Sequence, residues 1–543
     1  MRVSTNTQSA TLGGHTTAAT QASGKDGRHR LWRWVLVIVS LSALTLALVF
    51  IIMLDRAAPI LRGRIIETLG ARFESKVELD SVNVSVLNGL SVSGRGLRIY
   101  PPDEVVAAGA TAPLIAVDSF TFHAALRGLF FKPMHVSSVN VTRLSIHIPA
   151  KEYRAQGRPR RRRGKIKIVV EEIICDNSQL VIGTTKPGAE PKIFDLQHIV
   201  MHDFGSSRPW PYDATLTNAI PRGDIHAIGS FGPWNRESPG DSAVTGDYSF
   251  NHAELNTIRG IGGILSSTGS FNGQLDRITV DGSTDTPDFE IDTAKHPMPL
   301  HTDFHAIVDG TTGDTYLQPV RARLGSSSFV CSGKIVNQHG KGHRIDLDIN
   351  IPNGQVRDFL ELSVKTSPPV LSAGLNMRAK LVITPGPESV SRKMNIRGQF
   401  VLTHLHFANP AVQDKVDMLS LRAQGRPSEA QPGAADVRSS MHGTFALSRG
   451  LLSFHDLDYE LPGARVHLVG EYTLDGQRFD FAGKVRTDAK LSQMIASWWK
   501  SLLLKPVDPF FHKNGAGAEI PVKIMGTQSA PKFGLDLGSK KKH

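Results

Sequence analysis

Alternation of polar and apolar residues, repeated from residue 82 almost to the end of the chain, is the feature that most constrains the fold. Val82, Val84 and Val86 alternate with small polar residues. Successive side chains of a β-strand point to opposite faces, so this period predicts strands with one apolar and one polar face. The same period returns at 97–99, 144–148, 165–168, 344–349, 466–468 and 479–481. We therefore expect a mostly β fold.

The architecture is less constrained than the strand content. A β-sandwich, a barrel and one elongated, curved sheet would all alternate in this way. After residue 54 the chain shows neither a regular succession of strands and helices nor a sharp linker, which favours one continuous sheet. About 22 strands, spaced ~4.8 Å apart, would extend on the order of 100 Å. The apolar face of such a sheet would need to be covered by something.

A single uncharged run near the start of the chain predicts a transmembrane helix. Residues 34–54 contain no charge over 21 positions, enough to cross the ~30 Å hydrocarbon core of a bilayer. A cleaved signal peptide is the alternative, although its apolar stretch is usually shorter. Residues 1–33 have the polar composition of a disordered tail, which we expect in the cytoplasm, because a long domain after the span can be translocated regardless of its charge. The four-residue spacing of Leu61, Ile65, Leu69 and Phe73 predicts a short helix after the span.

The positive charge of the chain is concentrated. The formal net charge is +12, and most of it comes from the basic cluster between Arg158 and Lys167 and from Lys540–Lys542. The rest of the chain is nearly balanced, which argues against nucleic acid as a partner. Within the first cluster, Arg160, Arg161, Arg162 and Arg163 are candidates for contact with anionic headgroups. An ordinary solvated loop is the alternative.

Signatures of catalysis and of cofactor binding are absent from the sequence. It has no phosphate-binding glycine loop of the GxxxxGK[ST] or GxGxxG type, and neither GxSxG nor HExxH. We therefore expect neither an enzyme nor a cofactor. The histidine pairs 198/202, 301/305 and 404/406 have suggestive spacing, but few carboxylates lie near them in sequence. We expect these to be surface histidines and predict no metal site. Cys175 and Cys331 lie in apolar runs and are expected to be buried thiols, with one long-range disulfide as the alternative.

Near the end of the chain the period changes to that of an amphipathic helix over 488–504. Asp488 is the expected N-cap, and Pro506 would stop the helix. The helix would either pack over the end of the sheet or lie at a membrane surface. Its apolar face would comprise Leu491, Met494, Ile495, Trp498, Trp499 and Leu502.

Three segments carry a resemblance to a known family. They are 69–102 (LGARFESKVELDSVNVSVLNGLSVSGRGLRIYPP), 113–148 (PLIAVDSFTFHAALRGLFFKPMHVSSVNVTRLSIHI) and 443–494 (GTFALSRGLLSFHDLDYELPGARVHLVGEYTLDGQRFDFAGKVRTDAKLSQM). They resemble the AsmA-like family of bacterial envelope proteins, and the resemblance implies an inner-membrane anchor with a periplasmic body. That body would be a bent β-sheet enclosing an apolar groove, with short helices near both ends.

The resemblance also suggests a division of the chain and a function. The regions would be a tail (1–33), a span (34–54), an AsmA-like N-terminal region (55–150), a central groove (151–380) and an AsmA-like C-terminal region (381–543). The groove would carry or guide membrane lipids, most simply phospholipids, for biogenesis or maintenance of the bacterial envelope and its outer membrane. Candidate groove residues are Val82, Val84, Val86, Leu144, Ile146 and Ile148. The alternative is a scaffold or assembly factor that binds outer-membrane proteins or another envelope protein through edge strands.

Overall fold

The computed structural model describes residues 37–535 with gaps, and it divides the chain into two compact units, 1–64 and 65–543. The longer gaps are at 50–58, 71–74, 86–89, 102–105, 125–133, 149–167, 183–191, 234–238, 339–341, 475–477, 496–516 and 528–529. Shorter ones are at 38, 47, 60–61, 64, 68, 108, 110–111, 311 and 366.

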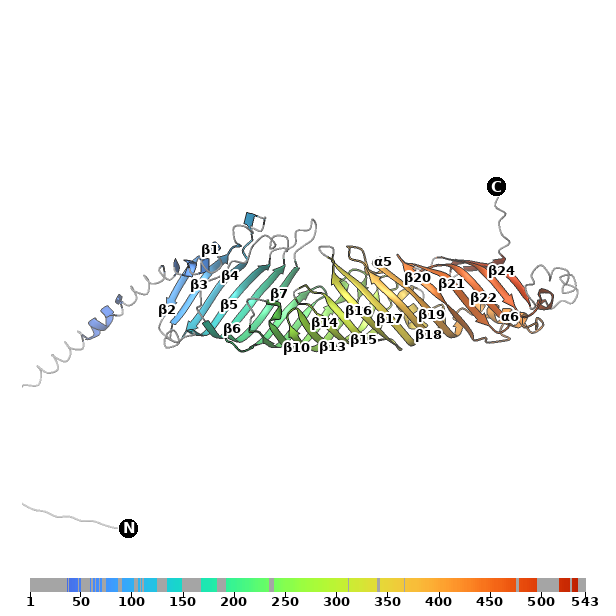
Figure 1. The fold of residues 1–543 in the computed structure, drawn as a ribbon, viewed down its shortest axis with the longest axis horizontal. Helices are drawn as coiled ribbons and strands as arrows, with labels where there is room; N and C mark the ends of the chain where they lie inside the picture. Colours follow the sequence, from blue (N-terminus) through green and yellow to red (C-terminus); the bar gives the residue numbers. More distant parts are fainter. Residues whose placement is uncertain are drawn as a thin grey trace, which may run out of the picture. The chain divides into compact units, whose positions relative to one another are not determined.

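One sheet dominates the second unit, and within the described residues it has 25 strands (Figure 1). The strands of the first half are β1 Val77–Glu78, β2 Ser81–Ser85, β3 Leu90–Ile99, β4 Ile115–Ala124, β5 Met134–Ile148, β6 Ile168–Ile182, β7 Lys192–Phe204, β8 Trp210–Ala219, β9 Arg222–Phe231, β10 Ala243–Glu254, β11 Ile261–Gly262, β12 Ile264–Gln274 and β13 Arg277–Ile291. Those of the second half are β14 Met298–Val308, β15 Thr315–Leu324, β16 Ser327–Asn337, β17 His343–Gln355, β18 Leu371–Ile383, β19 Met394–Phe407, β20 Ser439–Ser448, β21 Leu451–Leu461, β22 Ala464–Thr473, β23 Phe479–Thr487, β24 Ala518–Thr527 and β25 Ala530–Leu535.

Neighbours in sequence are neighbours in this sheet. From β3 to β10 and from β12 to β25 each strand pairs with the next one along the chain, and β10 pairs with β12. All of these pairs are antiparallel except β5 with β6. The predicted single elongated sheet is therefore confirmed, and its pairing continues across positions 150 and 380.

Most of the strands expected from alternation are confirmed. The runs at 82–84, 97–99, 144–148, 344–349, 466–468 and 479–481 lie in β2, β3, β5, β17, β22 and β23. The run at 165–168 is described only at Ile168, the first residue of β6.

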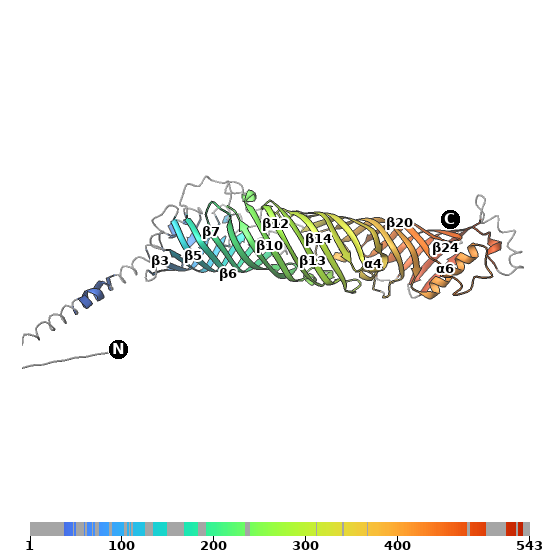
Figure 2. The same ribbon diagram turned by 90° about the horizontal axis from the view of Figure 1, so that it is seen from below.

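β-bulges bend the sheet along its length. The pairing register shifts within many strands, for example between Phe250 and Ala253 and between Leu402 and Leu405. His252 and His404 have left-handed backbone conformations, with φ of 52° and 56°, at these two shifts. An inserted residue increases local twist and curvature. The result is a long, curved sheet that does not close on itself, seen from below in Figure 2.

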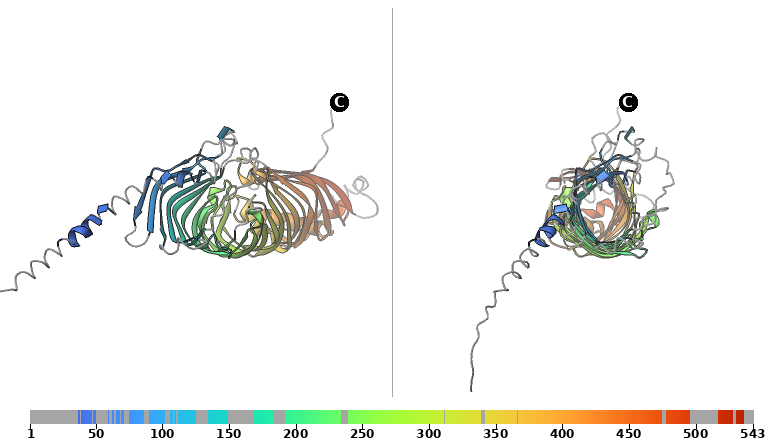
Figure 3. Two further views of the ribbon diagram at one scale, coloured as in Figure 1. Left: turned by 60° about the vertical axis from the view of Figure 1, so that its left-hand side comes forward. Right: turned by 90° about the vertical axis from the view of Figure 1, so that its left-hand side faces the viewer.

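Helices lie against one face of the sheet in its second half. They are α4 Val356–Ser363 and α6 Pro410–Ala423. The four-residue helix α5 Val390–Lys393 connects β18 to β19, and short 3₁₀ turns lie at η2 Pro239–Asp241, η3 Leu255–Thr257 and η4 Leu491–Met494. Figure 3 shows, end on, the sheet bending around the orange helix α6. The face that α6 covers is therefore the concave one.

The sequence around α6 explains why this helix forms where it does. Asn409 caps it, because its side-chain oxygen accepts a hydrogen bond from the Ala411 backbone N–H at 3.0 Å. Pro410 occupies the first turn, where a missing N–H costs nothing. Ala423 is fully buried, in one apolar cluster with Leu461 and Ala464 of the sheet. Helices were expected only near the two ends of the chain, and both α4 and α6 differ from that expectation.

Part of the predicted membrane span belongs to the first unit. Its described residues, Val37, 39–46 and 48–49, are helical. Among the residues that the structure describes, no helix combines the length and the apolar character needed to cross a membrane. The remainder of the predicted span lies outside the described residues. The predicted short helix after the span is helical at the positions described between 59 and 70.

The predicted amphipathic helix over 488–504 is wrong in its first part. Residues Leu491–Met494 form a 3₁₀ turn, and Ile495 is already extended. The burial also differs from the predicted face, because Ser492 is buried together with Met494. Local hydrogen bonds account for the turn: the Gln493 side-chain oxygen accepts from the Lys490 backbone N–H at 2.9 Å. Residues Trp498, Trp499 and Leu502 lie outside the described residues.

Candidate functional site

A continuous row of uncharged side chains crosses the sheet from β2 to β24. Every member is the direct cross-strand partner of the next, so all of them share one face. We name this the central row: Val84, Val92, Phe122, Val139, Ile173, Met201, Tyr212, Gly229, Gly246, Phe271, Val280, Ala306, Leu317, Gly333, Leu347, Leu381, Ile396, Leu447, Leu452, Tyr472, Phe479 and Gly526.

A flanking row of the same character runs two residues away on each strand, except on β15, where a bulge makes the separation three residues. Its first half runs through Val82, Gly94, Phe120, Val141, Cys175, Ile199, Ala214, Ala227, Tyr248, Gly269, Gly282 and Phe304. The bulge in β15 interrupts it, and it resumes as Val320, Cys331, Ile349, Ala379, Gly398, Phe445, Phe454, Gly470, Phe481 and Ile524. The two rows together make up the apolar face.

Most of the apolar face is only half-buried. In the central row Val92, Ala306 and Leu447 are buried, whereas the other members retain partial exposure. A large cluster of buried residues lies where α4 and α6 cover the face, and it includes Ile351 and Leu405, both 0% exposed. A single-layer sheet leaves one side of each large side chain without a packing partner. The described residues therefore leave apolar surface open over much of the length of the sheet.

Ionisable groups on this face are held in their neutral forms. Burial raises the pKa of the Cys175 thiol to about 11 and that of the Tyr212 hydroxyl to about 12. It also raises the pKa of the Cys331 thiol. Each shift arises mainly because a charged sulfur or oxygen would lose its hydration there. Both cysteines are free, so the alternative of a disulfide is wrong, and they are half-buried rather than buried as expected.

Aromatic rings lie over glycines in both rows of the apolar face. A Cβ atom added at Gly282 would come within 2.8 Å of Phe304 Cζ, and one at Gly246 within 3.0 Å of Phe271 Cζ. The ring of Phe120 covers Gly94 in the same manner. Glycine gives these rings room to lie across the neighbouring strand, so that the rings cover backbone that would otherwise be exposed.

The predicted groove residues lie in different parts of the structure, and two of them belong to the rows of the apolar face. Val84 belongs to the central row and Val82 to the flanking row, whereas Val86 lies outside the described residues. Leu144 and Ile146 pair with Val117 and Ile115, beyond a kink in β5. Ile148 ends β5, and its side chain lies outside the described residues.

The opposite face, which we name the outer face, is polar and carries many histidine–carboxylate pairs. Nδ1 of His198 lies 2.6 Å from Asp176, and Nδ1 of His305 lies 2.7 Å from Asp281. The His301 imidazole has a raised pKa, because its Nδ1–H donates to Asp285 at 2.7 Å. The sequence did not reveal these carboxylates, because they come from neighbouring strands. Two other histidines singled out in the sequence also have a carboxylate partner: His202 lies near Glu172 and His406 near Asp436. His404 lies at a bulge.

A hollow of about 800 Å³ lies over β16–β20. Its lining includes Lys380 and Arg397, which stand directly opposite each other on the outer face, together with Arg378. Lys380 is paired with Asp348 at 3.4 Å. The other basic cluster, Arg160, Arg161, Arg162 and Arg163, lies outside the described residues, between β5 and β6.

Comparison with known proteins identified no relative for this chain. No family model matches it, and neither the curated proteins nor the solved structures gave a match.

Proposed function

We propose that the chain is a membrane-anchored protein of the bacterial envelope whose apolar face forms a groove that carries or guides lipids. The observation that carries this proposal is the central row, which crosses the sheet from β2 to β24 without a charged side chain and is only half-buried for most of its length. A large exposed apolar surface typically marks a site for an apolar ligand or partner. The resemblance to the AsmA-like family supports the same proposal.

Acyl chains are the occupants that this face suits best. Each buried CH₂ contributes about 0.8 kcal/mol, and an acyl chain needs no hydrogen-bond partner. The sheet is a single layer that does not close, so a lipid headgroup could remain in water while its tails lie on the apolar face. At about 4.8 Å per strand, 25 strands extend on the order of 100 Å, several times the length of one lipid. A surface of this length suits several lipids arranged one after another better than it suits a single bound cofactor.

The proposed location is the inner membrane, with the N-terminus in the cytoplasm and the sheet in the periplasm. The uncharged run at 34–54 supports an anchor. Two polar side chains within it are satisfied locally: the Thr45 hydroxyl donates to the Leu41 carbonyl at 2.9 Å and the Ser42 hydroxyl to the Val39 carbonyl at 3.2 Å. Such bonds lower the cost of placing hydroxyls in lipid.

Reporter fusions test this orientation. A reporter fused after residue 100 should be active in the periplasm, and one fused before residue 30 should be inactive there.

Lipid recovery tests the proposed function. A chain beginning at residue 56, purified without detergent, should retain phospholipid that mass spectrometry identifies after solvent extraction. We expect at least one phospholipid per chain, because bare apolar surface of this extent is costly in water. Protein that is lipid-free after mild purification would contradict the proposal.

A scaffold that binds envelope proteins is the second proposal. The observation that favours it is at the end of the sheet, where β25 pairs with β24 alone among the described strands. An unpaired strand edge can accept a strand from another chain. Lipid-free protein that captures an outer-membrane protein through this edge would favour the scaffold.

A further inference from the structure

Two histidines and two aspartates gather on the outer face of β20, β21 and β22. His442 of β20 stands directly opposite Asp458 of β21, and Asp458 stands directly opposite His467 of β22. Asp456 lies two residues before Asp458 on the same strand and on the same face. The register of three strands therefore assembles a set of imidazole and carboxylate groups that are far apart in sequence.

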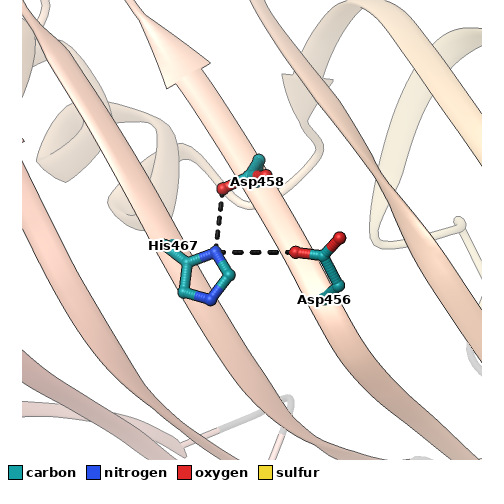
Figure 4. Close-up of side chains that lie close together, drawn as sticks. All are labelled: Asp456, Asp458 and His467. Atoms are coloured by element: carbon teal, nitrogen blue, oxygen red, sulfur yellow. Dashed lines mark hydrogen bonds and ion pairs between the residues drawn. The ribbon is translucent and has the colours of Figure 1, made fainter.

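Both carboxylates approach one nitrogen atom. Nδ1 of His467 lies 2.9 Å from Oδ1 of Asp458 and 3.7 Å from Oδ1 of Asp456 (Figure 4). Nε2 of His442 lies 3.5 Å from Oδ2, the other oxygen of Asp458. The three side chains of Asp456, Asp458 and His467 each offer one ligand atom, and these atoms all lie within 4.8 Å of one another.

This convergence sets the cluster apart from the other pairs described on the outer face. His301 meets its two carboxylates with different nitrogens, Nδ1 for Asp285 and Nε2 for Asp303. His305 has the single carboxylate of Asp281 within ion-pair distance of its Nδ1. At His467, one N–H can donate well to only one of the two carboxylates, and the second adds negative charge beside the first. A cation placed between the three groups would satisfy all of them.

The geometry points to a site for a divalent first-row metal ion, and we propose Zn²⁺ bound by Nδ1 of His467 and one oxygen each of Asp456 and Asp458. Bonds of about 2.0–2.2 Å in a tetrahedral arrangement place ligand atoms about 3.3–3.6 Å apart. The observed distances of 2.9 and 3.7 Å lie on either side of that spacing, so small rotations of the side chains suffice. Imidazole with carboxylate is a ligand set that suits Zn²⁺.

The surroundings supply the other requirements of such a site. His442 orients Asp458 through the oxygen that the metal leaves free, as outer partners of ligating carboxylates do. The side chains of His467 and Asp456 are 53% and 56% exposed, which leaves an entry path and room for water as the fourth ligand. A bound ion would link β21 to β22 and stabilise this part of the sheet.

Zinc titration of the full-length chain, solubilised in detergent and freed of metal with a chelator, tests the site. We expect one Zn²⁺ to bind more tightly than any other in calorimetry and to raise the melting temperature. Asp456→Asn and His467→Gln should each weaken this binding at least tenfold. The matched control is Asp281→Asn, which removes the carboxylate from the single-acid pair with His305 and should leave the tightest site unchanged.

Cobalt provides a readout that needs no variant. Co²⁺ bound to the unmodified chain should give the intense visible absorption of a tetrahedral site, and an equivalent of Zn²⁺ should remove it. Three results would contradict the site. They are a weak Co²⁺ spectrum of the octahedral type, the absence of saturable Zn²⁺ binding, and an unchanged Zn²⁺ affinity in Asp456→Asn or His467→Gln. Asp456→Asn preserves size and shape at an exposed position, so a folded variant is expected.

Discussion

Replacing Phe271, Val280 and Leu317 together by glutamate is expected to reduce co-purifying phospholipid at least tenfold while circular dichroism still reports a β-sheet. All three belong to the central row, on β12, β13 and β15, and all are half-buried. An ionised carboxylate in contact with an acyl chain loses hydration and gains no partner, at a cost that exceeds the gain from several CH₂ groups. The sheet survives because partial exposure lets each carboxylate reach water.

The matched control places three glutamates on the outer face of the same strands, as Asn272→Glu, Thr279→Glu and Gln318→Glu. These side chains lie next to the central-row positions in sequence and point to the opposite face. The control should retain its lipid. Equal lipid loss from both triple variants would count against the apolar face as the lipid path, and unfolding of the central-row variant alone would show that this face is ordinary packed core.

Leu405→Ala should destabilise the sheet far more than Leu347→Ala. Leu405 is 0% exposed in the cluster that α6 covers, where a leucine-to-alanine change removes contacts that the surroundings cannot replace. We expect a loss of about 2–5 kcal/mol in the free energy of unfolding. Leu347 is a half-buried member of the central row, and its truncation should cost about 1 kcal/mol.

Urea unfolding followed by circular dichroism measures both leucine variants on the same scale. A large shift of the midpoint for Leu405→Ala and a small one for Leu347→Ala would agree with a face that is packed under α6 and open elsewhere. Shifts of equal size would mean that the middle of the apolar face is packed as tightly as the part under α6, which would contradict an open groove.

The strands could be predicted from the sequence because alternation is a local signal, whereas the single sheet was favoured by the lack of a regular strand–helix succession and of a sharp linker after residue 54. Val82 and Val84 show it within five residues, and β2 follows. The central row could not be predicted, because its continuity depends on register. Phe271 and Val280 become partners only through the pairing of β12 with β13. The same holds for His442, Asp458 and His467, whose proximity spans three strands.

The helix α6 has local signals in the sequence that the prediction did not use. Asn409 and Pro410 form a recognisable start for α6, and Gly425 follows its end with a φ of 78°. At Leu491 the helical spacing was misleading, because the chain makes only one 3₁₀ turn there. Within 491–495, the part of the predicted helix face that the structure describes, apolar spacing does not outweigh the hydrogen bonds that Gln493 and Thr487 make with nearby backbone.

Photo-crosslinking in living cells tests most directly whether the apolar face carries lipid along its length. A benzophenone amino acid would replace Phe122, Phe271 or Phe479, which place it on the central row in β4, β12 and β23. The matched positions on the outer face are Thr121, Asn272 and Asp480. The account predicts phospholipid adducts at all three central-row positions and none at the outer ones. Adducts confined to one end of the row, or equal yields on the two faces, would contradict it.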